Sequence, residues 1–141
     1  MLLDTFQRPV KDLRISVTDR CNFRCTYCMP HDGIPLSPRS HLMTADEIET
    51  FAKVFVDHGV TKIRLTGGEP LVRKDFTAIL ARLAKLPVNL SITTNALLTH
   101  RFIEDFKRYG LHDINVSLDS LDAEKFKFKK FNRHESSLHS V

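Results

Sequence analysis

Three cysteines lie close together in this chain, and they are the residues best suited to carry chemistry. Cys21, Cys25 and Cys28 have the spacing C-x3-C-x2-C, and the chain contains no other cysteine. Cysteine thiolates are strong ligands for iron and zinc, and closed sites of either kind use four protein ligands. Three thiolates therefore predict a bound metal cluster with one coordination position left open for a reacting molecule.

Two other uses of the cysteines were weighed against a cluster. A structural zinc site would result if His31 or His41 supplied a fourth ligand. A disulfide would leave one thiol over, and nothing in the sequence indicates an oxidising compartment. The iron–sulfur cluster is the first hypothesis, and zinc is its structural alternative.

The elements that must position the cysteines can be predicted from apolar periodicity. Apolar runs and alternations predict strands over 12–18, 60–66, 88–94 and 113–118. Apolar residues at helical spacing predict helices over 45–58, from Phe76 to Leu83 and around Phe106, the last ended by Gly110. Thr44 and Glu47 have the spacing of a capping box, and Asp122 is expected to cap a last short helix.

Strands that alternate with helices indicate an α/β fold with a parallel sheet, whose functional loops lie beyond the carboxyl ends of the strands. The cysteine loop follows the first strand, and Gly67-Gly68-Glu69-Pro70 follows the second. Thr93-Thr94-Asn95 ends the third strand, and Ser117-Leu118-Asp119 ends the fourth. The sequence therefore predicts that these four segments meet at one edge of the sheet.

The cysteine motif, with an aromatic residue before its last cysteine, resembles that of radical S-adenosylmethionine (SAM) enzymes. The run from Leu13 to Pro30 is similar to one family of that group, the GTP 3′,8-cyclases of molybdenum-cofactor biosynthesis, also called molybdenum cofactor biosynthesis protein A. The likeness continues through residues 64–71, 93–95 and 115–119. It covers about residues 10 to 126 of the chain.

The resemblance implies the fold and the cofactors. It implies a (β/α) barrel of six strands, of which this chain holds about four, and a lyase that uses one [4Fe-4S] cluster and SAM. Cys21, Cys25 and Cys28 would hold the cluster, with SAM on the free iron. Tyr27, Gly68 and Ser117 would bind SAM, because they stand at the family's SAM-contacting positions.

The resemblance also implies the substrate and the partners. Arg14, Arg64 and Thr93 would bind GTP, which the family converts to 3′,8-cyclo-7,8-dihydro-GTP. A reductant of the flavodoxin or ferredoxin type would supply electrons, and cyclic pyranopterin monophosphate synthase would take the product. The structural alternative for Arg14 and Arg64 is exposure to solvent, or pairing with Asp12, Asp19 or Glu69. The functional alternatives are another radical SAM enzyme, or an inactive iron–sulfur or zinc-binding fragment.

The composition bounds these hypotheses. With 42% hydrophobic and 27% charged residues, the chain has the composition of a soluble globular protein. Its formal net charge of +4 suits a phosphate-bearing small ligand and does not by itself indicate nucleic acid. No stretch reaches the length of a membrane span, and the first residues lack a signal-peptide pattern. We therefore expect a cytoplasmic protein with reduced thiols.

The chain departs from the family toward its end. The family's second three-cysteine cluster has no counterpart, since no cysteine follows Cys28. We expect three regions: a lead-in over 1–10, a truncated barrel over 11–126, and a divergent, disordered tail over 127–141. A truncated barrel would have an open sheet edge and uncovered apolar inner faces, so we expect a homo-oligomer or an aggregation-prone chain, not a compact monomer.

Overall fold

Four parallel strands form one sheet in the computed structural model, which describes residues 1–25, 27, 28 and 35–131. The strands are β1 (Asp12–Ser16), β2 (Lys62–Thr66), β3 (Asn89–Thr94) and β4 (Leu111–Val116). The α-helices are α1 (Ala45–Asp57), α2 (Phe76–Leu83), α3 (Ile103–Tyr109) and α4 (Ala123–Phe131). Short 3-10 helices are η1 (Arg39–His41), η2 (Pro70–Val72) and η3 (Thr99–Arg101).

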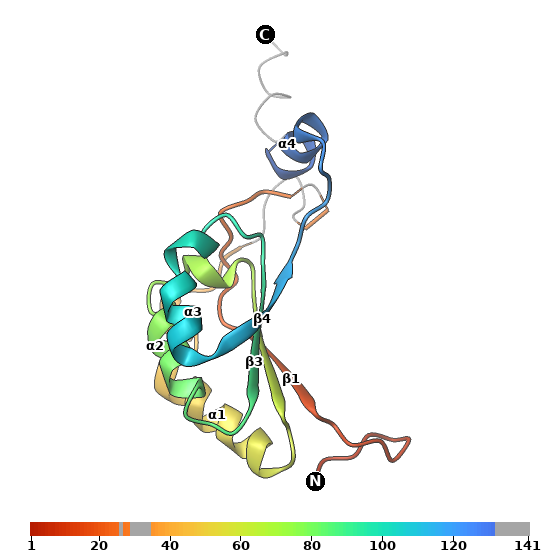
Figure 1. Cartoon of the computed structure of the whole chain (residues 1–141), viewed down its shortest axis with the longest axis vertical. Helices are drawn as coiled ribbons and strands as arrows, with labels where there is room; N and C mark the ends of the chain where they lie inside the picture. The colour runs from red at the N-terminus through yellow and green to blue at the C-terminus, as the bar shows by residue number, and fades with distance from the viewer. Residues whose placement is uncertain (26, 29–34, 132–141) are drawn as a thin grey trace.

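The strands follow one another across the sheet in the order β1-β2-β3-β4, and every neighbouring pair is parallel. A helix connects each strand to the next, and α1, α2 and α3 all lie against the same face of the sheet (Figure 1). The predicted α/β fold with four parallel strands is confirmed. The sheet is open, as a partial barrel must be.

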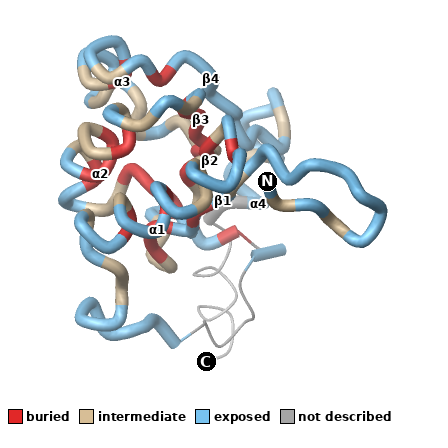
Figure 2. The backbone as a smooth tube through the Cα atoms, turned by 90° about the horizontal axis from the view of Figure 1, so that it is seen from below, coloured by how far each residue is buried: buried red, intermediate tan, exposed pale blue. Residues whose placement is uncertain are grey.

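The hydrophobic core lies between the sheet and these helices. Ile63, Leu65 and Ile92 on the strands and Phe76 and Leu80 on α2 are fully buried. Figure 2 shows the buried backbone segments gathered where the helices face the strands. The core residues of each strand are two positions apart, which is the spacing that puts side chains on one face.

Two predicted helix ends are confirmed. At the start of α1, the Glu47 N–H donates to the Thr44 hydroxyl at 3.2 Å and the Thr44 N–H donates to the Glu47 carboxylate at 2.7 Å. This is the reciprocal capping box. Helix α3 ends at Gly110, whose φ of 70° is left-handed and favours glycine.

Strand β4 begins two residues earlier than predicted because it follows Gly110 directly. Leu111 pairs with Leu90 and Asp113 pairs with Ser91, so His112 is an extra residue in the ladder. The extra residue breaks the period-two alternation: Leu111 and Ile114 both pair with core residues of β3 although they are three positions apart, so the alternation predicts the strand only from 113.

The expectation of an apolar inner face is wrong. The face of the sheet without helices carries the register row Arg14, Arg64, Ser91 and Asp113. The neighbouring rows bring Ser16 to Thr66, and Thr93 to Asn115. Because strand side chains alternate between faces, the apolar residues between these polar ones all point toward the helices. The open face is therefore polar.

Uncovered apolar side chains occur instead along the edge strand. Ile114, Val116 and Leu118 are 36%, 52% and 54% exposed. Ile114 and Val116 pair with Ile92 and Thr94, which lie on the helix-covered face. As far as Phe131, the chain after β4 continues past the carboxyl ends of the strands to α4 and does not return over this face (Figure 1). The helix side of β4 is therefore the open apolar surface.

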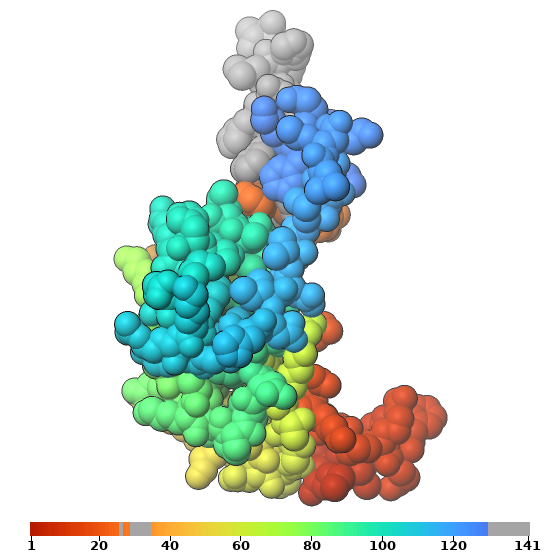
Figure 3. Space-filling view, viewed as in Figure 1, coloured from red at the N-terminus to blue at the C-terminus, as the bar shows by residue number. Residues whose placement is uncertain are grey.

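The two ends of the described chain lie at opposite ends of the sheet. The lead-in makes an antiparallel bridge between Leu3 and Pro9 and projects from the body of the molecule (Figure 3). At the other end, the Asp122 carboxylate accepts from the Lys125 N–H at 2.9 Å, which confirms the predicted cap. Helix α4 continues to Phe131, beyond the predicted tail boundary at 127. The rest of the tail lies outside the described residues.

No helix among the described residues has the length and apolar content needed to cross a bilayer.

Candidate functional site

The loop that follows β1 and the loop that follows β2 are joined backbone to backbone. The Gly68 N–H donates to the Thr18 carbonyl at 2.8 Å, and the Glu69 N–H donates to the Arg20 carbonyl at 2.8 Å. A Cβ on Gly68 would lie 2.3 Å from the Arg20 oxygen, and a Cβ on Gly67 would lie 2.4 Å from the Thr18 oxygen. Gly67 also has a φ of 147°. The two glycines are therefore required by the approach of another loop, whereas the sequence had suggested the approach of a ligand.

This junction forms one wall of a cavity of about 220 Å³ at the carboxyl ends of the strands. Seven of the nine predicted site residues line it: Cys21, Cys25, Tyr27, Cys28, Gly68, Thr93 and Ser117. They come from the carboxyl end of β3 and from the loops that follow β1, β2 and β4, as the parallel topology predicts. Arg14 and Arg64 are the two predicted residues that do not line it.

The three cysteines differ in exposure: Cys25 is buried, Cys21 is half-buried and Cys28 is exposed. The Phe23 N–H points at the Cys21 sulfur at 3.4 Å. Burial raises the pKa of the Cys21 thiol, and the negative charge of Glu69 adds to this, while the Phe23 hydrogen bond lowers it. Binding to a metal would therefore release a proton from Cys21.

The arrangement of the donors distinguishes a single metal ion from a cluster. Among the described residues, no three His, Cys, Asp or Glu side chains are close enough to hold one ion. His41 lies in the exposed helix η1, and His31 is outside the described residues. A cubane cluster presents a separate iron to each thiolate, so three thiols spread around one cavity fit it better than they fit a zinc ion.

Glu69 is a site residue that the sequence did not reveal. Its side chain is 1% exposed and lines the cavity. The carboxylate accepts from the Thr94 hydroxyl at 2.7 Å, the Asn95 N–H at 2.8 Å and the Leu71 N–H at 3.2 Å. It thereby ties the end of β2 to the end of β3. In the sequence, Glu69 stands between Gly67-Gly68 and Pro70. An acidic residue at such a place is also ordinary in turns, so the sequence alone did not mark Glu69 as a site residue.

Two further contacts tie the cysteine loop to its neighbours. The Tyr27 hydroxyl donates to the Asp119 carboxylate at 2.9 Å, and the Asn95 side chain donates to the Asn22 side chain at 2.7 Å. These bonds reach the loops after β4 and β3. The Phe23 ring also packs edge-on against Phe126 of α4, with 6.0 Å between centroids. The cavity walls are thus cross-linked through side chains.

Arg14 and Arg64 lie on the open polar face, further from the carboxyl ends of the strands, and are side by side in the register of β1 and β2. Arg64 precedes the cavity-lining Thr66 by two residues, a separation of about 7 Å along a strand. The Arg64 Nε donates to the Ser91 hydroxyl at 3.3 Å. The structural alternative was exposure to solvent or pairing with Asp12, Asp19 or Glu69. Among the described residues neither arginine pairs with these acids, but Arg14 is exposed, as that alternative expected, and Arg64 is half-buried.

The face around Arg64 is electropositive. Lys62 forms an ion pair with Asp113 at 2.5 Å. Its hydrogen bond, together with the nearby charges of Lys62 and Arg64, lowers the pKa of Asp113. This face carries three cations, Arg14, Lys62 and Arg64, and two carboxylates, Asp12 and Asp113, so a net positive charge remains to attract an anionic group.

Comparison with known proteins places these features in context. Residues 15–139 match the sequence model of the Radical SAM superfamily. A Drosophila melanogaster protein named molybdenum cofactor biosynthesis protein 1 is 49% identical over 127 residues, which cover 89% of this chain and 22% of that protein. A Campylobacter jejuni protein named GTP 3′,8-cyclase is 46% identical over 129 residues, which cover 90% of this chain and 40% of that protein. The chain spans two fifths or less of these relatives.

Solved structures show the fold of the same part. The chain matches Streptococcus suis SuiB bound to precursor peptide SuiA with a TM-score of 0.70 and 24% identity, over 84% of this chain and 26% of SuiB. It matches SuiB bound to S-adenosylmethionine with a TM-score of 0.69 and 24% identity, over the same shares. The open sheet described above therefore has the fold of a part of that larger protein.

Proposed function

The chain belongs to the radical SAM superfamily, and on that premise we propose that it is the cluster-binding and SAM-binding part of a GTP 3′,8-cyclase of molybdenum-cofactor biosynthesis. The observation that carries the proposal is the shared cavity of the three cysteines, Gly68 and Ser117. The identities of 44% to 49% to molybdenum-cofactor proteins and GTP 3′,8-cyclases favour this member of the superfamily over the alternatives.

Cys21, Cys25 and Cys28 would hold three irons of a [4Fe-4S] cluster. When bound, such a cluster supplies the electron for reductive cleavage of SAM. Gly68 presents backbone without a side chain to the cavity, and Ser117 presents a hydroxyl from the end of β4. Tyr27 lines the cavity, and its hydroxyl donates to the Asp119 carboxylate. These three residues would orient SAM and exclude water from it.

The open polar face would receive GTP. Thr93 lines the cavity, and Arg64 and Arg14 continue from it down the strands. An arginine guanidinium presents a planar fork of donors that matches phosphate oxygens. The triphosphate would lie against the two arginines, which places the ribose toward Thr93 and the cavity.

The complete reaction belongs to a longer protein. The relatives contain at least as much sequence again beyond the matched part. A second cluster that binds the purine, a lyase step that closes the ring, a reductant of the flavodoxin or ferredoxin type and transfer to cyclic pyranopterin monophosphate synthase are assigned to that complete enzyme.

The test is reconstitution of the chain with iron and sulfide without oxygen, followed by dithionite and SAM. We expect 5′-deoxyadenosine to form above the level of a Cys25→Ala control. Separately, Arg64→Ala should weaken GTP binding without changing the cluster spectrum. Equal 5′-deoxyadenosine from the wild-type chain and the Cys25→Ala variant would refute the assignment.

A further inference from the structure

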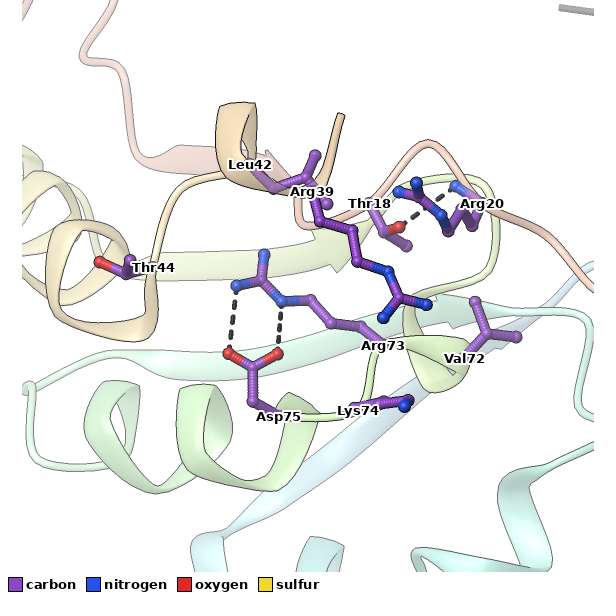
Figure 4. A pocket seen from close by; sticks show the side chains of 9 residues that line it. All are labelled: Thr18, Arg20, Arg39, Leu42, Thr44, Val72, Arg73, Lys74 and Asp75. Carbon is purple, nitrogen blue, oxygen red and sulfur yellow. Dashed lines mark hydrogen bonds and ion pairs between the residues drawn. The ribbon is translucent and has the colours of Figure 1, made fainter. Parts of the chain in front are cut away.

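A second cavity, of about 360 Å³, lies away from the cysteine site and shares no lining residue with it. Its walls are the segment after β1, the helix η1 with the approach to α1, and the segment between η2 and α2 (Figure 4). Four cations line it, Arg20, Arg39, Arg73 and Lys74, against a single acid, Asp75. The volume is within the range of small-molecule sites in proteins.

Arg73 forms a rigid wall of this cavity. Its side chain is only 10% exposed. It donates to the Val17 carbonyl at 2.7 Å and the Met43 carbonyl at 2.6 Å, and it makes a two-pronged ion pair with Asp75. Arg73 therefore neutralises the charge of the Asp75 carboxylate, and the hydrogen bond from Arg73 lowers the pKa of Asp75. One Nη1–H of Arg73 has no acceptor among the described residues.

The remaining cations differ in their pairing. Arg20 donates to Asp19 at 3.3 Å and to the Ser37 carbonyl at 3.2 Å, so its charge is compensated. Arg39 and Lys74 have no acidic partner among the described residues. Arg39 comes from η1 and Lys74 from the segment between η2 and α2 (Figure 4), and both exposed side chains line the cavity. Two cations that line one cavity without an acidic partner repel each other, and an anion bound in the cavity would relieve this.

We propose that this cavity binds a phosphoryl oxyanion, with Arg39 and Lys74 as its principal ligands and the spare Arg73 N–H as a third donor. Cationic side chains make strong, short hydrogen bonds to phosphate oxygens, and a buried, prearranged guanidinium loses little entropy on binding. The volume leaves room for a small phosphorylated molecule beside the phosphoryl group itself. Inorganic phosphate and a sugar phosphate are therefore the two sources to distinguish.

The proposed site adjoins the wall of the cysteine cavity. Thr18 and Arg20 line the basic cavity, and their backbone carbonyls accept the hydrogen bonds from the Gly68 and Glu69 N–H groups. Cys21 follows Arg20 directly. The proposal itself needs neither iron nor SAM, so it stands or falls independently of the proposed function.

The test is calorimetric titration of the full chain with inorganic phosphate and, separately, with glucose 6-phosphate, at an ionic strength held constant with sodium chloride. We expect saturable binding with one site, and roughly tenfold weaker binding in Arg39→Ala and in Lys74→Ala. Matched controls are Arg101→Ala, in the 3-10 helix η3, and Lys53→Ala, on the exposed side of α1; both should bind like the wild-type chain.

Tighter binding of glucose 6-phosphate would identify a phosphorylated metabolite as the source, and equal or weaker binding would identify free phosphate. The proposal would be overturned by titrations that do not saturate, or by equal losses in the control variants. It would also be overturned if Arg64→Ala abolished phosphate binding while Arg39→Ala and Lys74→Ala retained it, because the anion would then occupy the open face of the sheet.

Discussion

Individual side chains of this site both line the cavity and connect its loops to one another. Glu69 shows this most clearly, because its buried carboxylate accepts from Leu71 in its own segment and from Thr94 and Asn95 at the end of β3. Gly68 is required by a carbonyl of the neighbouring loop. The residues that would bind cofactors therefore sit on loops whose positions depend on a few polar contacts, and substitutions should reveal which contacts matter.

Replacing Glu69 with Gln should destabilise the chain by about 1 to 3 kcal/mol, because an amide NH₂ would face N–H donors that now have a carboxylate acceptor. Urea unfolding of the metal-free chain measures this change. The exposed Glu104→Gln, on α3, is the control and should change stability little. Equal effects of the two substitutions would mean that the Glu69 contacts contribute nothing.

Replacing Gly68 with Ala should cost about 2 kcal/mol or more, because the added carbon would overlap the Arg20 carbonyl and push the two loops apart. Iron bound per chain after reconstitution should fall as well. Gly110→Ala is the matched control: nothing lies within 4 Å of its Cβ, so only its left-handed backbone opposes it, at about 1 kcal/mol. A Gly68→Ala chain as stable as the Gly110→Ala chain would contradict the packing described.

At the scale of elements, apolar periodicity was sufficient to predict the strands and the first three helices. Ile63, Leu65 and Ile92 repeat at the spacing of a strand, and Thr44 and Glu47 mark the start of α1. The bulge at His112 and the role of Glu69 could not be predicted, since both depend on which strands become neighbours. Likewise, the sequence identified Arg14 and Arg64 through a resemblance, and only the register shows them side by side.

The capping box of α1 should make stability depend on pH. Hydrogen bonds from Thr44 lower the pKa of Glu47, so its contribution to stability is present above its ordinary pKa of 4.5 and is lost as pH falls through the lowered value. Thr44→Ala should cost about 1 kcal/mol near neutral pH and return the Glu47 pKa toward 4.5. An NMR titration measures the pKa, and an unchanged Glu47 pKa in Thr44→Ala would argue against the cap.

At the scale of the whole molecule, the chain is an open sheet with helices on one face. Its inner face is polar, and its uncovered apolar side chains lie on the helix side of β4. A polar open face needs no partner to be soluble, whereas an uncovered apolar edge strand favours association. We therefore still expect a homo-oligomer, but because of the exposed apolar side chains of β4 and not because of an apolar inner face.

Val116→Lys should reduce self-association, because it places a charge on the exposed side of the edge strand, where Val116 is 52% exposed. Light scattering of the purified chain at increasing concentration measures the average mass. We expect the wild-type chain to exceed the mass of a monomer and the Val116→Lys chain to approach it. A monodisperse wild-type monomer that melts cooperatively would show that the edge is harmless.

The central claim is that three cysteines hold a cluster with one iron open to SAM. Electron paramagnetic resonance of the anaerobically reconstituted, dithionite-reduced chain, recorded with and without SAM, tests it most directly. The account predicts about four irons per chain and a cluster signal that changes when SAM is added. Bound zinc without iron, or a cluster signal that is the same with and without SAM, would contradict it.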